Sequence, residues 1–93
     1  MKFIDYLGKM DLTDKTMFWL CSLEDLEKGY CLLLERSKKK KFYLRSIGYH
    51  HLIVYDYFTD EEVEDWDRCT KEEFEENLRN FIKEYKIKEV SCY

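Results

Sequence analysis

The chain has 93 residues, of which 45% are hydrophobic and 17% aromatic, and its formal net charge is −4. This length fits one domain covering residues 1–93, and the apolar content is that of a globular protein rather than a disordered one. No stretch approaches the roughly 20 apolar residues of a membrane helix, and no signal peptide is recognised. We therefore expect a cytoplasmic protein that does not act at a membrane.

Four strands are predicted in the first two thirds of the chain, after a short amphipathic helix at residues 2–10. A single helical turn at 23–29, with Ser22 as a candidate cap, separates the first two strands. The connections are too short for parallel crossovers, which need about a dozen residues, so the strands should form an antiparallel meander. The aliphatic, aromatic and β-branched runs that indicate these strands lie at 16–22, 30–36, 42–47 and 50–58.

Two helices are predicted to follow the strands. Thr59 with Glu62, and Thr70 with Glu73, both match the capping-box pattern, in which the two side chains satisfy free N–H groups at a helix start. The last residues, 86–93, fit either an extension of the second helix or a short edge strand. The second helix also carries the cleanest helical stripe of apolar residues in the chain, formed by Phe74, Leu78, Phe81, Ile82 and Tyr85.

The predicted fold class is therefore α+β, with a four-stranded antiparallel sheet, an N-terminal helix and C-terminal helices packed on the sheet. Both faces of the fourth strand are apolar or aromatic. Alternation places Leu52 and Val54 on one face, and Ile53, Tyr55 and Tyr57 on the other. We favour the interpretation that helices cover both faces. The alternative is that the tyrosine-rich face stays partly open as a contact surface.

Acidic residues are concentrated between residues 56 and 76. This segment has eleven acidic and two basic residues, a net charge of −9, whereas the remaining nine acidic and fourteen basic residues give +5. Two or three acids at each helix start are explained by the helix macrodipole, while the others repel one another and lower stability. Solubility is the ordinary explanation for such a run. The alternative is a partner with a basic surface.

Carboxylates spaced along helices can imitate the phosphates of a nucleic acid, which carries one charge per about 1.7 Å of duplex axis. We expect a non-enzymatic inhibitor whose acidic helical surface binds the basic groove of a nuclease or another nucleic-acid-handling protein. Trp66 fits a core position at least as well as that of an interface anchor. The predicted partner-binding residues are Tyr57, Asp60, Glu61, Glu62, Glu64, Asp65, Trp66, Asp67, Glu72, Glu75 and Glu76.

In length, element order and acidic patch, the chain resembles the small acidic α+β inhibitors that phages deploy against bacterial nucleases. That group includes anti-CRISPR and anti-restriction proteins that act as DNA mimics. The resemblance implies a protein partner in a bacterial or virus-infected cell, and it implies no enzymatic activity.

Two other functions compete with this one. An immunity or antitoxin protein would use the same acidic surface to neutralise a basic toxin. A small nucleic-acid-binding module would instead use the basic hairpin at Lys38–Lys41 with Tyr43 and Tyr49. The sequence pI of about 5.2 disfavours direct nucleic-acid binding, and a lysine-rich hairpin tip also discourages sheet-to-sheet aggregation.

The sequence contains no catalytic motif, so we expect no enzyme, no cofactor and no metal. There is no C-x-x-C pair, no G-x-S-x-G and no glycine-rich phosphate loop. A zinc site built from Cys69, Cys92, His50 and His51 would match no standard spacing. Cys69 is expected to be the most exposed thiol.

Overall fold

The computed structural model describes residues 22–93. The helix predicted at 2–10 lies outside the described residues. So does the strand predicted at 16–22, apart from Ser22, which caps the first described helix. The prediction of a short helical turn after Ser22 is confirmed, because the Ser22 hydroxyl accepts a hydrogen bond from the Asp25 N–H at 3.2 Å.

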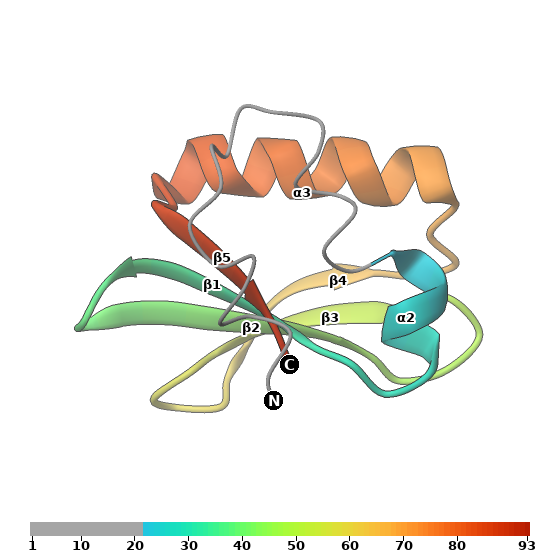
Figure 1. Cartoon of the computed structure of the whole chain (residues 1–93), viewed down its shortest axis with the longest axis horizontal. Coiled ribbons are helices and arrows are strands. Elements are labelled where there is room, and N and C mark those ends of the chain that lie inside the picture. The colour runs from blue at the N-terminus through green and yellow to red at the C-terminus, as the bar shows by residue number, and fades with distance from the viewer. Residues whose placement is uncertain (1–21) are drawn as a thin grey trace.

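Five antiparallel strands form one sheet in the order β4-β3-β2-β1-β5, and the long helix α3 lies across one face of it (Figure 1). The short helix α2 lies at one end of the sheet. In chain order the elements are α2 (Leu23–Glu27), β1 (Leu32–Ser37), β2 (Lys40–Ser46), β3 (Leu52–Asp56), β4 (Glu62–Trp66), α3 (Lys71–Tyr85) and β5 (Glu89–Cys92).

The α+β class and the antiparallel pairing are confirmed, but the prediction of a four-stranded meander is wrong. Strands β1, β2 and β3 correspond to three of the predicted strands. The sheet gains β4, where a helix was predicted, and β5, which is the edge-strand alternative for the last residues. Because β5 pairs with β1 and not with its neighbour in sequence, the sheet is not a simple meander.

The first predicted capping box does not start a helix, because Asp56 closes a turn there instead. Its Oδ1 accepts hydrogen bonds from the N–H groups of Phe58 and Thr59 at 2.8 and 3.1 Å. Asp60 adopts a left-handed conformation with φ of 63°, which Asp tolerates better than most residues. The chain therefore reverses, and β4 satisfies the outer backbone groups of β3.

The second capping box is confirmed and begins α3. The Thr70 hydroxyl accepts from the Glu73 N–H at 3.2 Å, and the Glu73 carboxylate accepts from the Thr70 N–H at 3.1 Å. The helix ends at Tyr85, and Lys86 follows in the left-handed conformation (φ 53°) common at helix C-termini. Four members of the predicted apolar stripe are buried: Phe74, Leu78, Phe81 and Ile82.

The core lies between α3 and the inner face of the sheet. Phe42 of β2 meets Phe81 edge-to-face with 5.1 Å between the ring centroids, and Tyr85 stacks on Phe81 at 4.3 Å. Trp66 is only 8% exposed and belongs to the same cluster. Burying a large apolar side chain stabilises a fold by about 1.5–3 kcal/mol. The structure therefore places Trp66 in the core, and it leaves the ring little surface to offer a partner.

Candidate protein-binding surface

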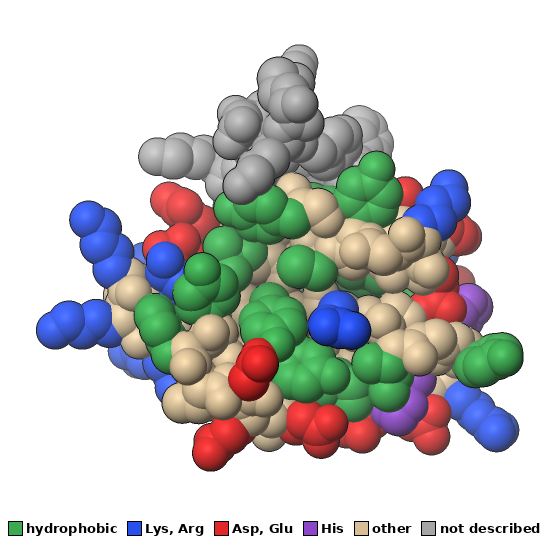
Figure 2. Space-filling view, turned by 90° about the horizontal axis from the view of Figure 1, so that it is seen from below, with side chains coloured by type: hydrophobic (Ala, Val, Ile, Leu, Met, Phe, Trp, Pro, Cys, Tyr) green, Lys and Arg blue, Asp and Glu red, His purple; other side chains and the backbone are tan. Residues whose placement is uncertain are grey.

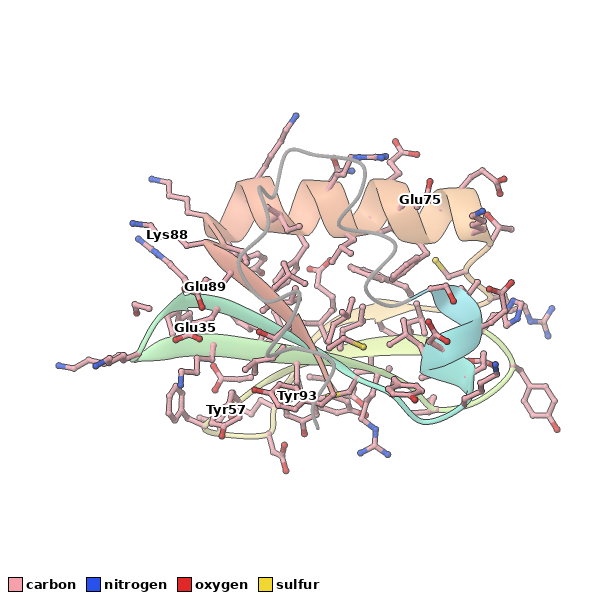
Figure 3. All side chains as sticks on the ribbon, in the orientation of Figure 1. Glu35, Tyr57, Glu75, Lys88, Glu89 and Tyr93 are labelled. Atoms are coloured by element: carbon pink, nitrogen blue, oxygen red, sulfur yellow. The ribbon has the colours of Figure 1, made fainter. Side chains whose placement is uncertain are left out.

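The sheet face away from α3 carries a row of tyrosines. Strand register places Leu33, Tyr43 and Tyr55 side by side across β1, β2 and β3, and the rings of Tyr43 and Tyr55 stack with centroids 4.9 Å apart. Tyr57 and Tyr93 lie on this same side of the sheet (Figure 3) and are 50% and 42% exposed. We call these five residues the tyrosine face.

Both described helices contribute to the core on the opposite face of the sheet, through residues such as Leu26 of α2 and Leu78 of α3. Within residues 22–93, no helix packs on the tyrosine face. The exposures of Tyr57 and Tyr93 fit the alternative of a partly open face, whereas Ile53, which alternation places on the same face, is buried with 1% exposure.

Two shallow hollows lie next to each other on the tyrosine face, with hydrophobic side chains gathered around its centre (Figure 2). They share Cys31 and Tyr43. The first has a volume of about 340 Å³ and is also lined by Gly29, Tyr30, Arg45 and Ser46. The second has a volume of about 290 Å³ and is also lined by Leu33, Tyr57 and Tyr93.

Acidic side chains gather along one margin of the same view (Figure 2). Strand β4 is the edge strand of the described sheet there, and its exposed carboxylates continue those of the turn before it. We call this run the acidic margin; its members are Asp60, Glu61, Glu62, Asp65 and Asp67, all exposed.

The acidic margin has no cationic partner of the lysine or arginine type within the described part of the chain. Among residues 22–93, Lys and Arg nitrogens approach carboxylates within 4.0 Å in only two pairs, Lys40 with Asp56 and Lys41 with Glu35, both at 3.9 Å. Neither carboxylate belongs to the acidic margin. Its negative charge is therefore not neutralised by strong bases within these residues.

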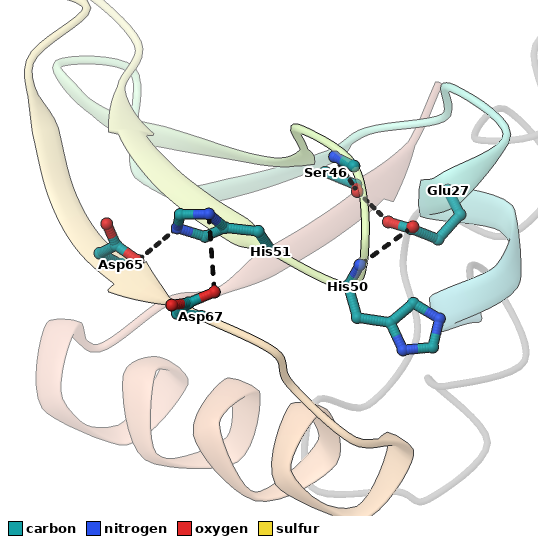
Figure 4. Close-up of polar contacts among 7 residues, drawn as sticks. Glu27, Ser46, His50, His51, Asp65 and Asp67 are labelled. Carbon is teal, nitrogen blue, oxygen red and sulfur yellow. Dashed lines mark hydrogen bonds and ion pairs between the residues drawn. The ribbon is translucent and has the colours of Figure 1, made fainter.

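Three members of the acidic margin have other contacts. Asp60 accepts a short hydrogen bond from the Tyr43 hydroxyl, which raises the pKa of Tyr43 to about 12. Asp65 and Asp67 flank the imidazole of His51, with N···O distances of 2.6 and 3.7 Å (Figure 4). Tyr43 of β2 therefore holds Asp60 in place, and His51, just before β3, holds Asp65 and Asp67.

The remaining predicted acids lie elsewhere. Glu72, Glu75 and Glu76 belong to α3, and Figure 3 shows Glu75 on the side of that helix away from the sheet. The Glu64 carboxylate accepts from the Trp66 Nε1–H at 3.4 Å, so it is turned toward a core residue. The predicted partner-binding acids therefore divide into the acidic margin and a separate group on α3, and do not form one helical surface.

The expectation that Cys69 is an exposed thiol is wrong. Its side chain is buried with 2% exposure, and burial is the main cause that raises its pKa. Within residues 22–93, no three His, Cys, Asp or Glu side chains are grouped so that they could hold a metal ion. In the same range, no helix is both long and apolar enough to cross a membrane.

Sequence reasoning did not single out Leu33 or Cys31 as members of a surface. Alternation along 50–58 does indicate a second apolar face, but it does not show which strands lie beside it. The side-by-side placement of these residues depends on strand order, which is a property of the whole fold.

Comparison of the chain with protein-family models, with curated proteins and with solved structures found no match.

Proposed function

We propose that this protein is a non-enzymatic inhibitor, which binds a basic surface of a nuclease or another nucleic-acid-handling protein through its acidic margin. One observation carries the proposal: five exposed carboxylates follow one another between Asp60 and Asp67, and none has a lysine or arginine partner among residues 22–93. A cationic partner would relieve the repulsion among them.

The extended backbone of β4 suits this role as well as a helix would. An antiparallel strand rises about 3.4 Å per residue, and successive phosphates of one DNA strand are also about 3.4 Å apart along the axis. Successive side chains of a strand point to opposite faces, so carboxylates that share a face are about two residues, or roughly 7 Å, apart. The exposed carboxylates between Glu61 and Asp67 therefore produce a line of negative charge whose spacing is about twice that of the phosphates along one strand. Such a line complements a lysine- and arginine-lined groove.

Edge protection is the competing structural explanation for these acids. Charged side chains on an edge strand prevent it from pairing with the sheet of another molecule. One or two charges are enough for that purpose. Edge protection alone does not account for carboxylates that continue through the turn at Asp60 and Glu61 and beyond the strand at Asp67.

The basic hairpin supports a nucleic-acid-binding module less well. Lys40 pairs with Asp56 and Lys41 pairs with Glu35, so two of its four lysines are engaged by carboxylates of the fold. Lys40 and Lys41 also lie over the rings of Phe42 and Tyr57, at 5.1 and 5.4 Å from the centroids. These contacts favour a structural role for the two lysines.

The proposal is tested by competition for DNA. The full chain is titrated into complexes of a fluorescently labelled DNA duplex with an RNA-guided nuclease, and separately with a restriction endonuclease. We expect displacement of the duplex from at least one of them, followed as a fall in fluorescence anisotropy. Displacement should weaken as salt rises, because exposed charges are screened over about 8 Å at physiological ionic strength. Displacement from neither, or displacement that is indifferent to salt, would contradict the proposal.

A further inference from the structure

Arg45 is exposed in the middle of the tyrosine face. It belongs to β2, the central strand of the described sheet. Strand register places it opposite Ile53 of β3, and it lines the first hollow together with Cys31, the residue before β1. Among residues 22–93, no carboxylate lies within 4.0 Å of its guanidinium. An arginine carries five N–H donors and forms its strongest contacts with carboxylates, often through two parallel hydrogen bonds.

The surroundings of Arg45 have the composition of the centre of a protein interface. Arg45 lines the first hollow, and Tyr43 separates it from the second, which is lined by Leu33, Tyr57 and Tyr93. Tyrosine and arginine are the residue types, together with tryptophan, that supply most binding energy at such centres. Acidic residues are depleted there. On this face they lie instead at its two borders, on β4 and where β1 meets β5.

We propose that the tyrosine face is a second binding surface, which takes a segment of another protein bearing an Asp or Glu opposite Arg45 and a large apolar side chain in each hollow. The carboxylate would complete the hydrogen bonds of the guanidinium. The hollows, at about 340 and 290 Å³, are open and neighbouring, so two apolar side chains close together on one segment can enter both.

Nucleic acid fits this surface less well. Acidic side chains border it on both sides, with Glu62 and Asp65 on β4 and Glu35 paired with Glu89 where β1 meets β5. Figure 3 shows Glu35 and Glu89 close together at that edge. Phosphates crossing the face would meet these carboxylates, although its tyrosines alone could stack on bases.

A second copy of this chain also fits less well. A two-fold symmetric contact brings the same patch together with itself, so Arg45 would face the centre of another tyrosine face. Among residues 22–93, no Asp or Glu side chain lines the two hollows at that centre, so none would receive the guanidinium. A foreign segment with its own carboxylate is the better complement.

The test uses a displayed library of random peptides selected on the full chain and, in parallel, on Arg45→Glu. We expect the unmodified chain to enrich peptides with an Asp or Glu next to two large apolar residues. Arg45→Glu should enrich Lys or Arg at the acidic position. A synthetic peptide of the first consensus should lose at least tenfold in affinity on Arg45→Glu, while the charge reversal Lys83→Glu on the far side of the molecule should leave its affinity unchanged.

Folding of each variant is checked by circular dichroism, and Arg45→Gln replaces Arg45→Glu if the latter does not fold. The proposal is overturned if no acidic consensus emerges, or if the peptide binds the Arg45 variant as tightly as the unmodified chain. It is also overturned if labelled single-stranded DNA binds the face, or if sedimentation shows self-association that Arg45→Glu abolishes.

This inference does not depend on the proposed function, because the two rest on different residues. Glu61→Lys with Glu62→Lys should leave peptide binding intact while it reduces displacement of DNA. Failure of one surface is therefore distinguishable from failure of the other.

Discussion

Residues 59–67 and residues 70–76 begin with the same Thr-x-x-Glu pattern and are similarly rich in carboxylates, yet the first forms a turn and an edge strand and the second begins a helix. The difference lies in what precedes each pattern. Asp56 bonds the N–H groups of Phe58 and Thr59 and so closes a turn. Nothing comparable competes for the Thr70 N–H, which bonds Glu73. A capping pattern starts a helix only where no neighbouring side chain occupies its backbone donors.

The acids of the two stretches also differ in what they do for the fold. Glu72 and Glu73 lie in the first turn of α3, where the macrodipole favours negative charge. Glu61 and Glu62 of the acidic margin have no helix beside them and no lysine or arginine partner among residues 22–93. The fold explains the negative charge of the first pair and does not explain that of the second pair.

The largest effect on stability is expected from a substitution at Trp66, the residue of the first stretch that the structure places in the core. Trp66→Ala should lower the free energy of unfolding by about 3–5 kcal/mol, because the ring is buried against α3 and its loss leaves a cavity. Chemical denaturation measures this change. Unchanged stability together with weakened partner binding would show that the ring belongs to the interface instead.

A smaller effect is expected from the two threonines. Thr70→Ala should cost about 1 kcal/mol of stability, the usual cost of losing a helix cap. Thr59→Ala should cost less, because its hydroxyl caps no helix: it accepts from the Glu61 N–H at 3.3 Å and donates to the Asp56 carboxylate. If thermal or chemical unfolding shows that both variants lose the same free energy of unfolding, the capping pattern at Thr59 would stabilise a helix start as the one at Thr70 does.

Single charge reversals compare the acids directly. Glu72→Lys should destabilise the protein by about 0.3–1 kcal/mol, since it places a positive charge at the positive end of α3. Glu61→Lys should leave stability unchanged or slightly raised, because it removes repulsion within the acidic margin. A stability loss at Glu61 as large as that at Glu72 would assign the margin a structural role.

The smallest effect concerns Asp56 and pH. Backbone hydrogen bonds from Phe58 and Thr59 are the main cause that lowers the pKa of Asp56. Its ionised form therefore contributes stability above the ordinary Asp pKa of about 3.9, and that contribution is lost as pH falls through the depressed value. The stability difference between the unmodified chain and Asp56→Asn should be largest above about pH 4 and should vanish in stronger acid. A difference independent of pH would contradict this account of the turn.

Helix α3 could be predicted because the apolar stripe from Phe74 to Tyr85 has a helical period. Strands β1 to β3 could be predicted because runs of aliphatic, aromatic and β-branched residues are separated by short connections. Strand β4 could not. Its Glu and Asp residues are poor strand formers, and pairing with β3 overrides their preference. The burial of Cys69 was missed for a related reason, because it depends on which elements lie beside this residue.

The acidic segment could be located from composition alone, but its division into the acidic margin and the acids of α3 could not.

The most direct measurement compares these two groups of acids. Two double reversals change the net charge equally: Glu61→Lys with Glu62→Lys in the margin, and Glu72→Lys with Glu76→Lys on α3. Each is compared with the unmodified chain for displacement of labelled duplex from a nuclease from which the unmodified chain displaces it. The account predicts that the margin reversal abolishes displacement and that the helix reversal preserves it. Equal weakening by both, or no weakening by the margin reversal, would contradict the central claim.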